Sequence, residues 1–192
     1  MREAAPHFIV VWSRCKRLAT RRALILGLLV ALAGCRSRNR TAVKNEEDGG
    51  PPRLAAVLKM GDAATQTQLA AGFHKIEEGA WRWTAGKFSV ELRAPLASSQ
   101  NGATLTLGFR IPDVSIAKLG PLSLTAAIGT TKLKTEKYSS AGAQTLTADV
   151  PPESLADENV RIDFTLDKYF AAGAVEGREL GVIANSVGLE GK

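Results

Sequence analysis

The chain has 192 residues, a formal net charge of +6, two cysteines and two histidines, a length that suits one domain with a tether. Six of its 25 basic residues, but only one of its 19 acidic residues, precede Cys35, so the rest of the chain is nearly neutral. A nucleic-acid-binding surface built on excess positive charge is therefore excluded for the part after Cys35.

The first recognisable element is an apolar stretch near the N-terminus. Arg21 and Arg22 precede the apolar run 23–32, which small residues follow. A basic flank, an apolar core of about ten residues and small residues are typical of a secretory signal peptide. The run is too short to span a bilayer, which takes about 20 apolar residues.

The end of that run, Leu32-Ala33-Gly34-Cys35, resembles the lipobox of bacterial lipoproteins. The resemblance implies cleavage between Gly34 and Cys35 and lipidation of Cys35, with palmitate among the acyl chains. Residues 1–34 are then a lipoprotein signal peptide, and the protein reaches the membrane through lipidated Cys35. An ordinary signal peptide with a chance cysteine is the alternative.

The residue after Cys35 bears on the destination in the cell envelope. The resemblance places Asp at this position in many lipoproteins retained at the inner membrane, and here it is Arg36. We therefore expect the outer membrane in an organism that has one, and otherwise the outer face of the cell membrane.

Residues 35–53 are expected to form the lipidated cysteine and a disordered tether. The segment is polar and charged and ends in Gly49-Gly50-Pro51-Pro52, so it has too little apolar surface to order itself. Cys15 lies in the leader and Cys35 is expected to be acylated, so no internal disulfide is predicted. The folded part must therefore be stabilised by an apolar core.

Residues 54–72 are expected to be a short helical lead-in. Asp62 is a helix N-cap candidate, the residues 63–71 are good helix formers, and Gly72 is a stop signal. From Phe73 onward the apolar period changes to two, so we place the start of the sheet domain, 73–192, at that residue.

Apolar and polar residues alternate in short runs through the remainder of the chain, separated by Gly, Pro and Asn turns. The clearest predicted strands are 87–93, 103–111, 122–128 and 160–167; weaker ones are 80–84, 131–138, 143–150 and 180–184. This pattern predicts an all-β fold, an antiparallel two-sheet β-sandwich of about seven to nine strands.

Few residues are suited to catalysis or cofactor binding. His74 is the only histidine after Cys35, and no Gly-x-Ser-x-Gly elbow is present, so a hydrolase triad and a zinc or iron site are disfavoured. The acidic residues of 157–167 could bind calcium, but Asp163 and Asp167 fit the wet face of a strand better. We expect no metal, no cofactor and no enzymatic activity; a glycosidase with paired carboxylates ranks last.

Aromatic residues supply the remaining candidates for ligand contact. Trp81 and Trp83 fall on one face of a short strand, where they could stack on a sugar or cap the core, and we favour the core. Tyr138 and Tyr169 are expected on or near loops, where they could contact a ligand.

Three short segments resemble small β-sandwich modules that occur alone or beside bacterial glycosyltransferase domains. The segments are Gly72-Phe73-His74-x-x-Glu77, Trp81-Arg82-Trp83-Thr84 and Arg178-Glu179-Leu180-Gly181-Val182. The resemblance implies an accessory role near glycans and carries over no catalytic residue. Independently of any family, Arg82 and Arg178 lie near the acidic segments Glu77-Glu78 and Glu179, with which they could pair.

Two functions fit these observations. The first is an envelope lipoprotein whose β-sandwich binds a glycan without catalysis. The second is a structural or assembly protein that recognises an envelope protein through a sheet edge or a loop.

Overall fold

The computed structural model describes residues 53–192. The predicted signal peptide, the lipidation site Cys35 and the tether up to residue 52 lie outside the described residues. Within the described part, none of the helices combines the length and the apolar character needed to cross a membrane.

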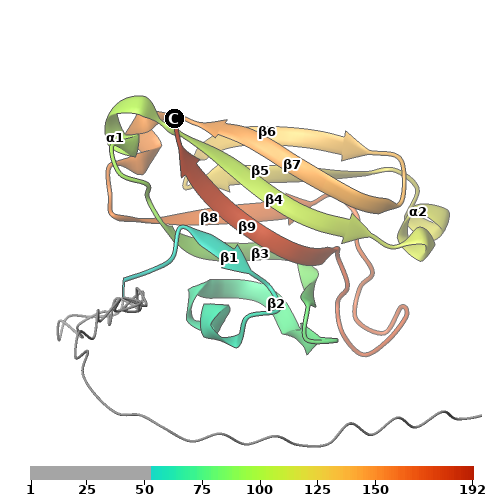
Figure 1. Cartoon of the computed structure of the whole chain (residues 1–192). Coiled ribbons are helices and arrows are strands. Elements are labelled where there is room, and N and C mark those ends of the chain that lie inside the picture. The colour runs from blue at the N-terminus through green and yellow to red at the C-terminus, as the bar shows by residue number, and fades with distance from the viewer. Residues whose placement is uncertain (1–52) are drawn as a thin grey trace, which may run out of the picture. The chain divides into compact units, whose positions relative to one another are not determined.

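Nine antiparallel strands form one sheet that folds over into two facing layers (Figure 1). The strands are β1 Val57–Lys59, β2 Leu69–Glu77, β3 Trp81–Arg93, β4 Ala103–Ile111, β5 Leu122–Ile128, β6 Thr131–Tyr138, β7 Gly142–Val150, β8 Asn159–Leu166 and β9 Ile183–Gly191. The predicted all-β antiparallel sandwich is confirmed.

Strand β3 joins the two layers. The strand order is β6-β5-β8-β3-β9-β4-β7, with β1 added to β9 and β2 added to β3. Near its start, β3 pairs with β9 through Arg82 and Trp83, whereas its residues from Lys87 to Arg93 pair with β8. The layers are thus continuous through one long strand, which the sequence had predicted as two short ones.

The opposite side of the sandwich, between β6 and β7, is bridged by side chains. Lys134 Nζ donates a hydrogen bond to the Thr147 carbonyl at 2.9 Å, and the Tyr138 hydroxyl donates to the Thr145 carbonyl at 3.4 Å. Tyr138 thus lies next to a loop, as expected, but its side chain is buried. It ends β6, and its ring packs edge-on against Phe109 in the core at 5.1 Å between ring centroids.

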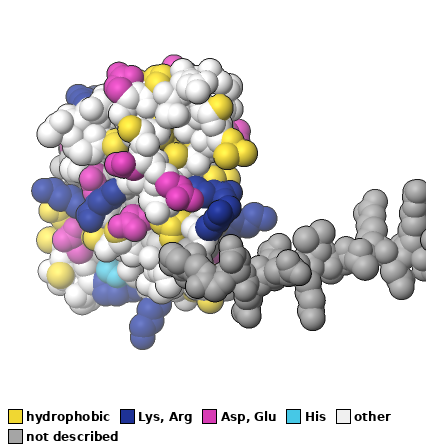
Figure 2. All heavy atoms as spheres, turned by 90° about the vertical axis from the view of Figure 1, so that its left-hand side faces the viewer, with side chains coloured by type: hydrophobic (Ala, Val, Ile, Leu, Met, Phe, Trp, Pro, Cys, Tyr) yellow, Lys and Arg dark blue, Asp and Glu magenta, His cyan; other side chains and the backbone are white. Residues whose placement is uncertain are grey.

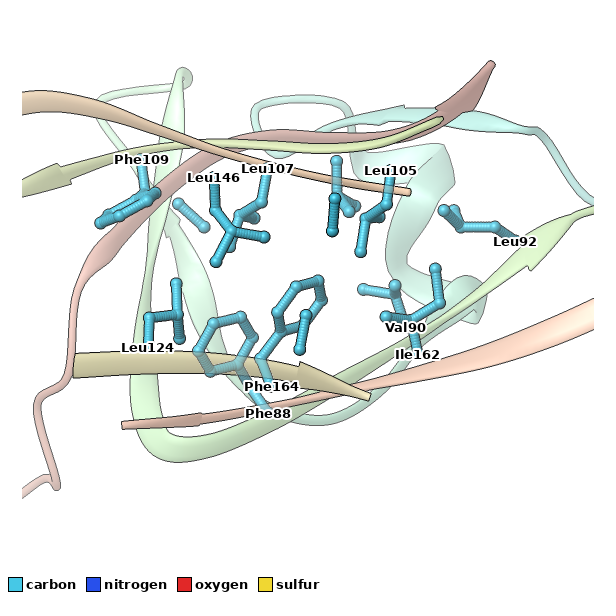
Figure 3. Packing of buried hydrophobic residues seen from close by; sticks show 14 of the residues in the cluster. Phe88, Val90, Leu92, Leu105, Leu107, Phe109, Leu124, Leu146, Ile162 and Phe164 are labelled. Atoms are coloured by element: carbon cyan, nitrogen blue, oxygen red, sulfur yellow. The ribbon is translucent and has the colours of Figure 1, made fainter. Parts of the chain in front are cut away.

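The core fills the space between the layers, as Figure 3 shows. Leu105, Leu107 and Phe109 of β4 face the other layer, where Phe88 and Phe164 stack with ring centroids 4.9 Å apart. In the sequence, each of these residues is an apolar position of a strand in which apolar and polar residues alternate. Burial of the apolar positions therefore explains the register of the strands.

The predicted lead-in contains strands as well as a helix. Asp62 caps a 3₁₀ helix, Ala63–Gln68, by accepting a hydrogen bond from the Ala64 amide at 2.9 Å. The chain then enters β2 directly, so Gly72 does not end a helix. Gly72 has a φ of +74° inside β2, where an added Cβ would lie 2.1 Å from the Lys87 carbonyl oxygen, and this close approach requires glycine. Because β1 also lies in 54–72, the segment contributes to the sheet.

Two further short helices, α1 Ser98–Asn101 and α2 Asp113–Leu119, and a second 3₁₀ helix, Pro152–Leu155, occupy connections that the sequence predicted as turns. The last strand begins at Ile183 rather than at residue 180. Leu180 forms an isolated bridge with Phe170 instead, so residues 180–182 close a loop before β9 begins.

Candidate functional site

The three sequence segments that carried the resemblance meet at one place in the fold. We call it the corner, made of residues 72–77 of β2, 81–86 of β3, and 176–183. Thr84 holds it together: its carbonyl accepts from the Gly181 amide at 2.6 Å and its amide donates to the Val182 carbonyl at 2.8 Å. The Val182 amide also donates to Thr84 Oγ1 at 3.1 Å.

Arg82 is buried in the corner, with 3% of its surface exposed. Its Nε donates to the Met60 carbonyl at 3.1 Å and its Nη1 to the His74 carbonyl at 3.0 Å. The expected pairing with a carboxylate is wrong, because these partners are backbone oxygens. Burial lowers the pKa of the Arg82 guanidinium. This arginine ties β1 and β2 to β3 and is not offered to a ligand.

Arg178 links the loop before β9 to β2. Its guanidinium contacts Glu176 Oε1 at 2.5 Å and Glu77 Oε1 at 2.9 Å. Arg178 therefore pairs with one of the acidic residues that the sequence offered, Glu77, and with Glu176, which the sequence did not single out. Hydrogen bonds to Glu176 and then to Glu77 raise the pKa of Arg178. His74 Nε2 donates to the Glu179 carbonyl at 2.7 Å, which adds a second link.

Tyr169 and Glu179 pack against the bend of β3. Glu179 Oε1 accepts a hydrogen bond from the Gly86 amide at 2.6 Å. The Tyr169 ring lies where a Cβ on Gly86 would be, at 2.2 Å, and the side chain remains 39% exposed. Tyr169 is thus at the corner, in the loop where it was predicted.

Trp81 and Trp83 lie on the outer side of β3. Their neighbours Arg82 and Thr84 are buried, and alternation along the strand turns the two indoles to the other side, where both are half-buried. The rings meet edge to face, with centroids 6.4 Å apart and planes at 79°. They are outside the core cluster, so the favoured expectation that they cap the core is wrong.

The register places specific neighbours beside the indoles. Glu77 is directly opposite Trp81, and Ile183 is directly opposite Trp83. Arg110 of β4 is opposite Ile183. Directly opposite residues of antiparallel strands point to the same face. Trp83, Ile183 and Arg110 therefore form one row across three strands, which we call the aromatic row. The sequence showed Arg110 on the wet face of its strand but gave no signal for its pairing.

A shallow groove of about 500 Å³ adjoins the start of β3. It is lined by Lys59, Gly61, Asp62, Gly79, Ala80, Asn185 and Ser186. Ala80 immediately precedes Trp81, so polar and charged groups of this groove lie near the indole pair.

A second groove, of about 360 Å³, lies where the β6 start, the β7 end and the C-terminal lysine meet. Asp149 and Lys192 line it, and a hydrogen bond from Lys192 lowers the pKa of the Asp149 carboxyl.

Tyr138 is not part of either surface. Only 6% of it is exposed, so the ring has no free face for a ligand. Burial, followed by the nearby Glu136, raises the pKa of its hydroxyl.

Two acidic residues that were considered as calcium ligands are engaged in local contacts. Asp163 pairs with Arg161 at 3.1 Å, and Asp167 accepts from the Ser123 amide. In residues 53–192 no group of three or more His, Cys, Asp or Glu side chains is arranged to hold a metal ion.

Figure 2 shows acidic and basic side chains interspersed with apolar ones on one face of the domain. The corner combines the half-buried indoles and the partly exposed Tyr169 with polar and charged groups.

Comparisons with known proteins leave the family unassigned. No protein-family model matches the chain, and no curated protein sequence matches it. Among solved structures, it is similar to TmCBM27, a carbohydrate-binding module described for specific mannan recognition, with 11% identity, a TM-score of 0.43, and coverage of 72% of this chain and 97% of the other.

Two further solved structures are similar to this chain. One is the structure of CBM51-2 in complex with GlcNAc and of INT domains, from Clostridium perfringens ZmpB. The identity is 10%, the TM-score is 0.35, and the match covers 71% of this chain and 28% of the other. The other is a xylanase of Cellvibrio japonicus with xylopentaose: identity 13%, TM-score 0.37, 73% of this chain and 28% of the other. Similarity at this level supports no conclusion about the family or activity of the chain.

Proposed function

We propose that the described domain is a non-catalytic module that binds a glycan through Trp81 and Trp83, and that lipidated Cys35 holds it at the cell envelope. The observation that carries the binding proposal is the indole pair itself: two tryptophans packed against each other on the outer side of a sheet, outside the core.

The physical argument concerns exposed apolar surface. An indole buries about 150 to 250 Å² when it is covered, and leaving part of that area in water has a free-energy cost. Trp81 and Trp83 leave part of their surface uncovered although the core is otherwise well filled. The C–H face of a sugar ring can cover an indole, while nearby polar groups bond its hydroxyls, as Asn185 and Ser186 of the adjoining groove could do.

The glycan proposal is tested by binding of the purified full chain to an oligosaccharide array, followed by titration calorimetry on the positive sugars. Trp81→Ala and Trp83→Ala are each expected to lower affinity about five- to 150-fold, because stacking on a ring contributes on the order of 1–3 kcal/mol. Leu96→Ala is the matched control, since that apolar side chain is 98% exposed and lies beyond the other end of β3.

Two results would remove the glycan proposal. One is an array without binding; the other is binding that neither tryptophan substitution changes. Crosslinking in cells that recovers one recurrent protein partner, and no glycan, would instead favour the assembly role.

The membrane anchor is supported by the leader sequence and the resemblance of Leu32-Ala33-Gly34-Cys35 to a lipobox. We place the protein at the outer membrane where one exists, because Arg36 follows the cysteine, and otherwise at the outer face of the cell membrane. Mass spectrometry of native protein is expected to show an N-terminus at Cys35 carrying acyl chains, and Cys35→Ser to release the protein from membranes. An unmodified thiol with the leader still attached contradicts the anchor.

A further inference from the structure

Arg110 stands at one end of the aromatic row, two strands away from Trp83. Cα atoms of opposite residues are about 4.5–5.5 Å apart, so the Cα atoms of Arg110 and Trp83 are about 10 Å apart across Ile183. An arginine side chain is long enough to span much of that distance. A sugar stacked on Trp83 therefore brings its substituents, or the next sugar unit, within reach of the Arg110 guanidinium.

The guanidinium of Arg110 is available. The side chain is exposed, and among the contacts of residues 53–192 it has neither an ion pair nor a side-chain hydrogen bond. The two arginines of the corner differ from it. Arg82 is committed to backbone carbonyls, and Arg178 to Glu77 and Glu176.

The immediate surroundings of Arg110 carry no compensating charge. Its two directly opposite neighbours are Ile183 on β9 and Ala143 on β7, both uncharged. Gly108, two residues before it on the same face of β4, has no side chain to cover the surface. The result is a cation next to the apolar side chain of Ile183, which in turn is next to Trp83.

We infer that the site, if it binds a glycan as proposed above, takes an acidic glycan whose sugar carboxylate is bound by Arg110. The planar guanidinium fork matches a carboxylate in bidentate geometry, which is the strongest polar contact available to an exposed arginine. Trp83 supplies the stacking surface, Ile183 the apolar strip between, and Arg110 the charge. The aromatic row thereby selects uronic-acid units over neutral sugars of the same ring shape.

The test compares oligomers of galacturonate, glucuronate and mannuronate, each with its carboxyl-reduced, neutral counterpart, against the purified full chain. We expect at least one acidic oligomer to bind about tenfold or more tightly than its reduced form, since a hydrogen bond to a charged group contributes about 1.5–3 kcal/mol. Arg110→Gln is expected to abolish this preference, because it should lower affinity for the acidic form about tenfold more than affinity for the reduced form. Trp83→Ala should weaken both forms.

Lys87→Gln is the control, because it removes one positive charge from the outer side of the other layer, where Lys87 is paired opposite Thr165. Equal binding of acidic and reduced oligomers, or a preference that Arg110→Gln leaves intact, overturns this inference while the glycan proposal stands. Failure of the chain to bind any oligosaccharide, on this panel and on the array, overturns the proposed function and this inference with it.

Discussion

The facing layers and the corner are built on different principles. Pairing of β4 with β7 runs without interruption from Ala103 opposite Val150 to Ile111 opposite Gly142. Pairing of β2 with β3 shifts register three times within nine residues of β2. The layers are specified by a repeated alternation of side chains, whereas the corner depends on single contacts, each made once.

This difference separates stability from recognition. Burial of apolar area is not directional, and many side chains share it between the layers. Polar contacts in the corner instead fix the positions of particular groups, Arg82 below the indoles and Arg178 beside them. We therefore expect core substitutions to change mainly the free energy of unfolding, and corner substitutions to change local order and binding.

The largest expected effect is on the core. Phe164→Ala removes a ring that is stacked on Phe88 and fully buried, so the free energy of unfolding should fall by about 3–5 kcal/mol. Chemical denaturation measures the change. Trp83→Ala removes a larger side chain, but one that is half-exposed, so it should lower the free energy of unfolding clearly less. An equal or larger loss for Trp83→Ala would show that the indole is a core residue after all.

The second effect concerns the one buried cation of the corner. Arg82→Met keeps an unbranched apolar stem in place of the arginine stem but leaves the Met60 and His74 carbonyls without their donors, which should destabilise the fold by about 2–3 kcal/mol. Denaturation of this variant is compared with Arg93→Met at the far end of β3, for which a small change is expected. Equal stability of both variants would mean that the carbonyls find other partners and that Arg82 is dispensable.

The contrast also explains what the sequence could predict. Strands 103–111 and 122–128 were predicted with the bounds they have, because apolar side chains at every second position can be buried together only if they form one face of a strand. The break predicted between residues 84 and 87 was wrong, because β3 continues through Gly86. The lack of a side chain at Gly86 makes room for the Tyr169 ring.

The sequence indicated which residues could form the site, but not how the fold would place them relative to one another. The motif segments contain Trp81, Trp83, Glu77 and Arg178, and all four lie at the corner, although the sequence did not say which acidic residue pairs with Arg178. The place of Arg110 beside them depends on the pairing of β9 with both β3 and β4, which brings together residues far apart in the sequence. No local pattern encodes such a register, so this part of the site required the structure.

The stability of the fold is expected to depend on pH where side chains bridge β6 and β7. Burial raises the pKa of Tyr138 above the value near 10 of an unfolded tyrosine. The folded state therefore keeps the proton to higher pH than the unfolded state. This stability is fully present below about pH 10 and falls by about 1.4 kcal/mol per pH unit above it. Tyr138→Phe should be about as stable as wild type at pH 7 and more stable at pH 11, as thermal unfolding across that range would show. Parallel losses in both proteins would contradict a buried, protonated Tyr138.

The smallest change in stability is expected where the change in local order is clearest. Arg178→Gln breaks a pair of partly exposed contacts and should cost less than about 1 kcal/mol in global unfolding. It also removes one of the few links that hold the loop before β9, whose tip carries the 52% exposed Val175. Hydrogen exchange in residues 171–179 should accelerate several-fold while exchange in β4 and β8 stays unchanged.

Arg161→Gln is the matched control for Arg178→Gln, because the pair of Arg161 with Asp163 is of similar exposure but lies on a regularly paired strand. Backbone pairing there continues on both sides, so loss of the ion pair should leave exchange in β8 as it was. Accelerated exchange in β8 of this control, or an unchanged loop in Arg178→Gln, would mean that side-chain pairs are equally important in both regions. Faster exchange of the loop in Arg178→Gln, together with unchanged exchange of β8 in Arg161→Gln, would show that a single guanidinium orders the corner, where backbone pairing is interrupted.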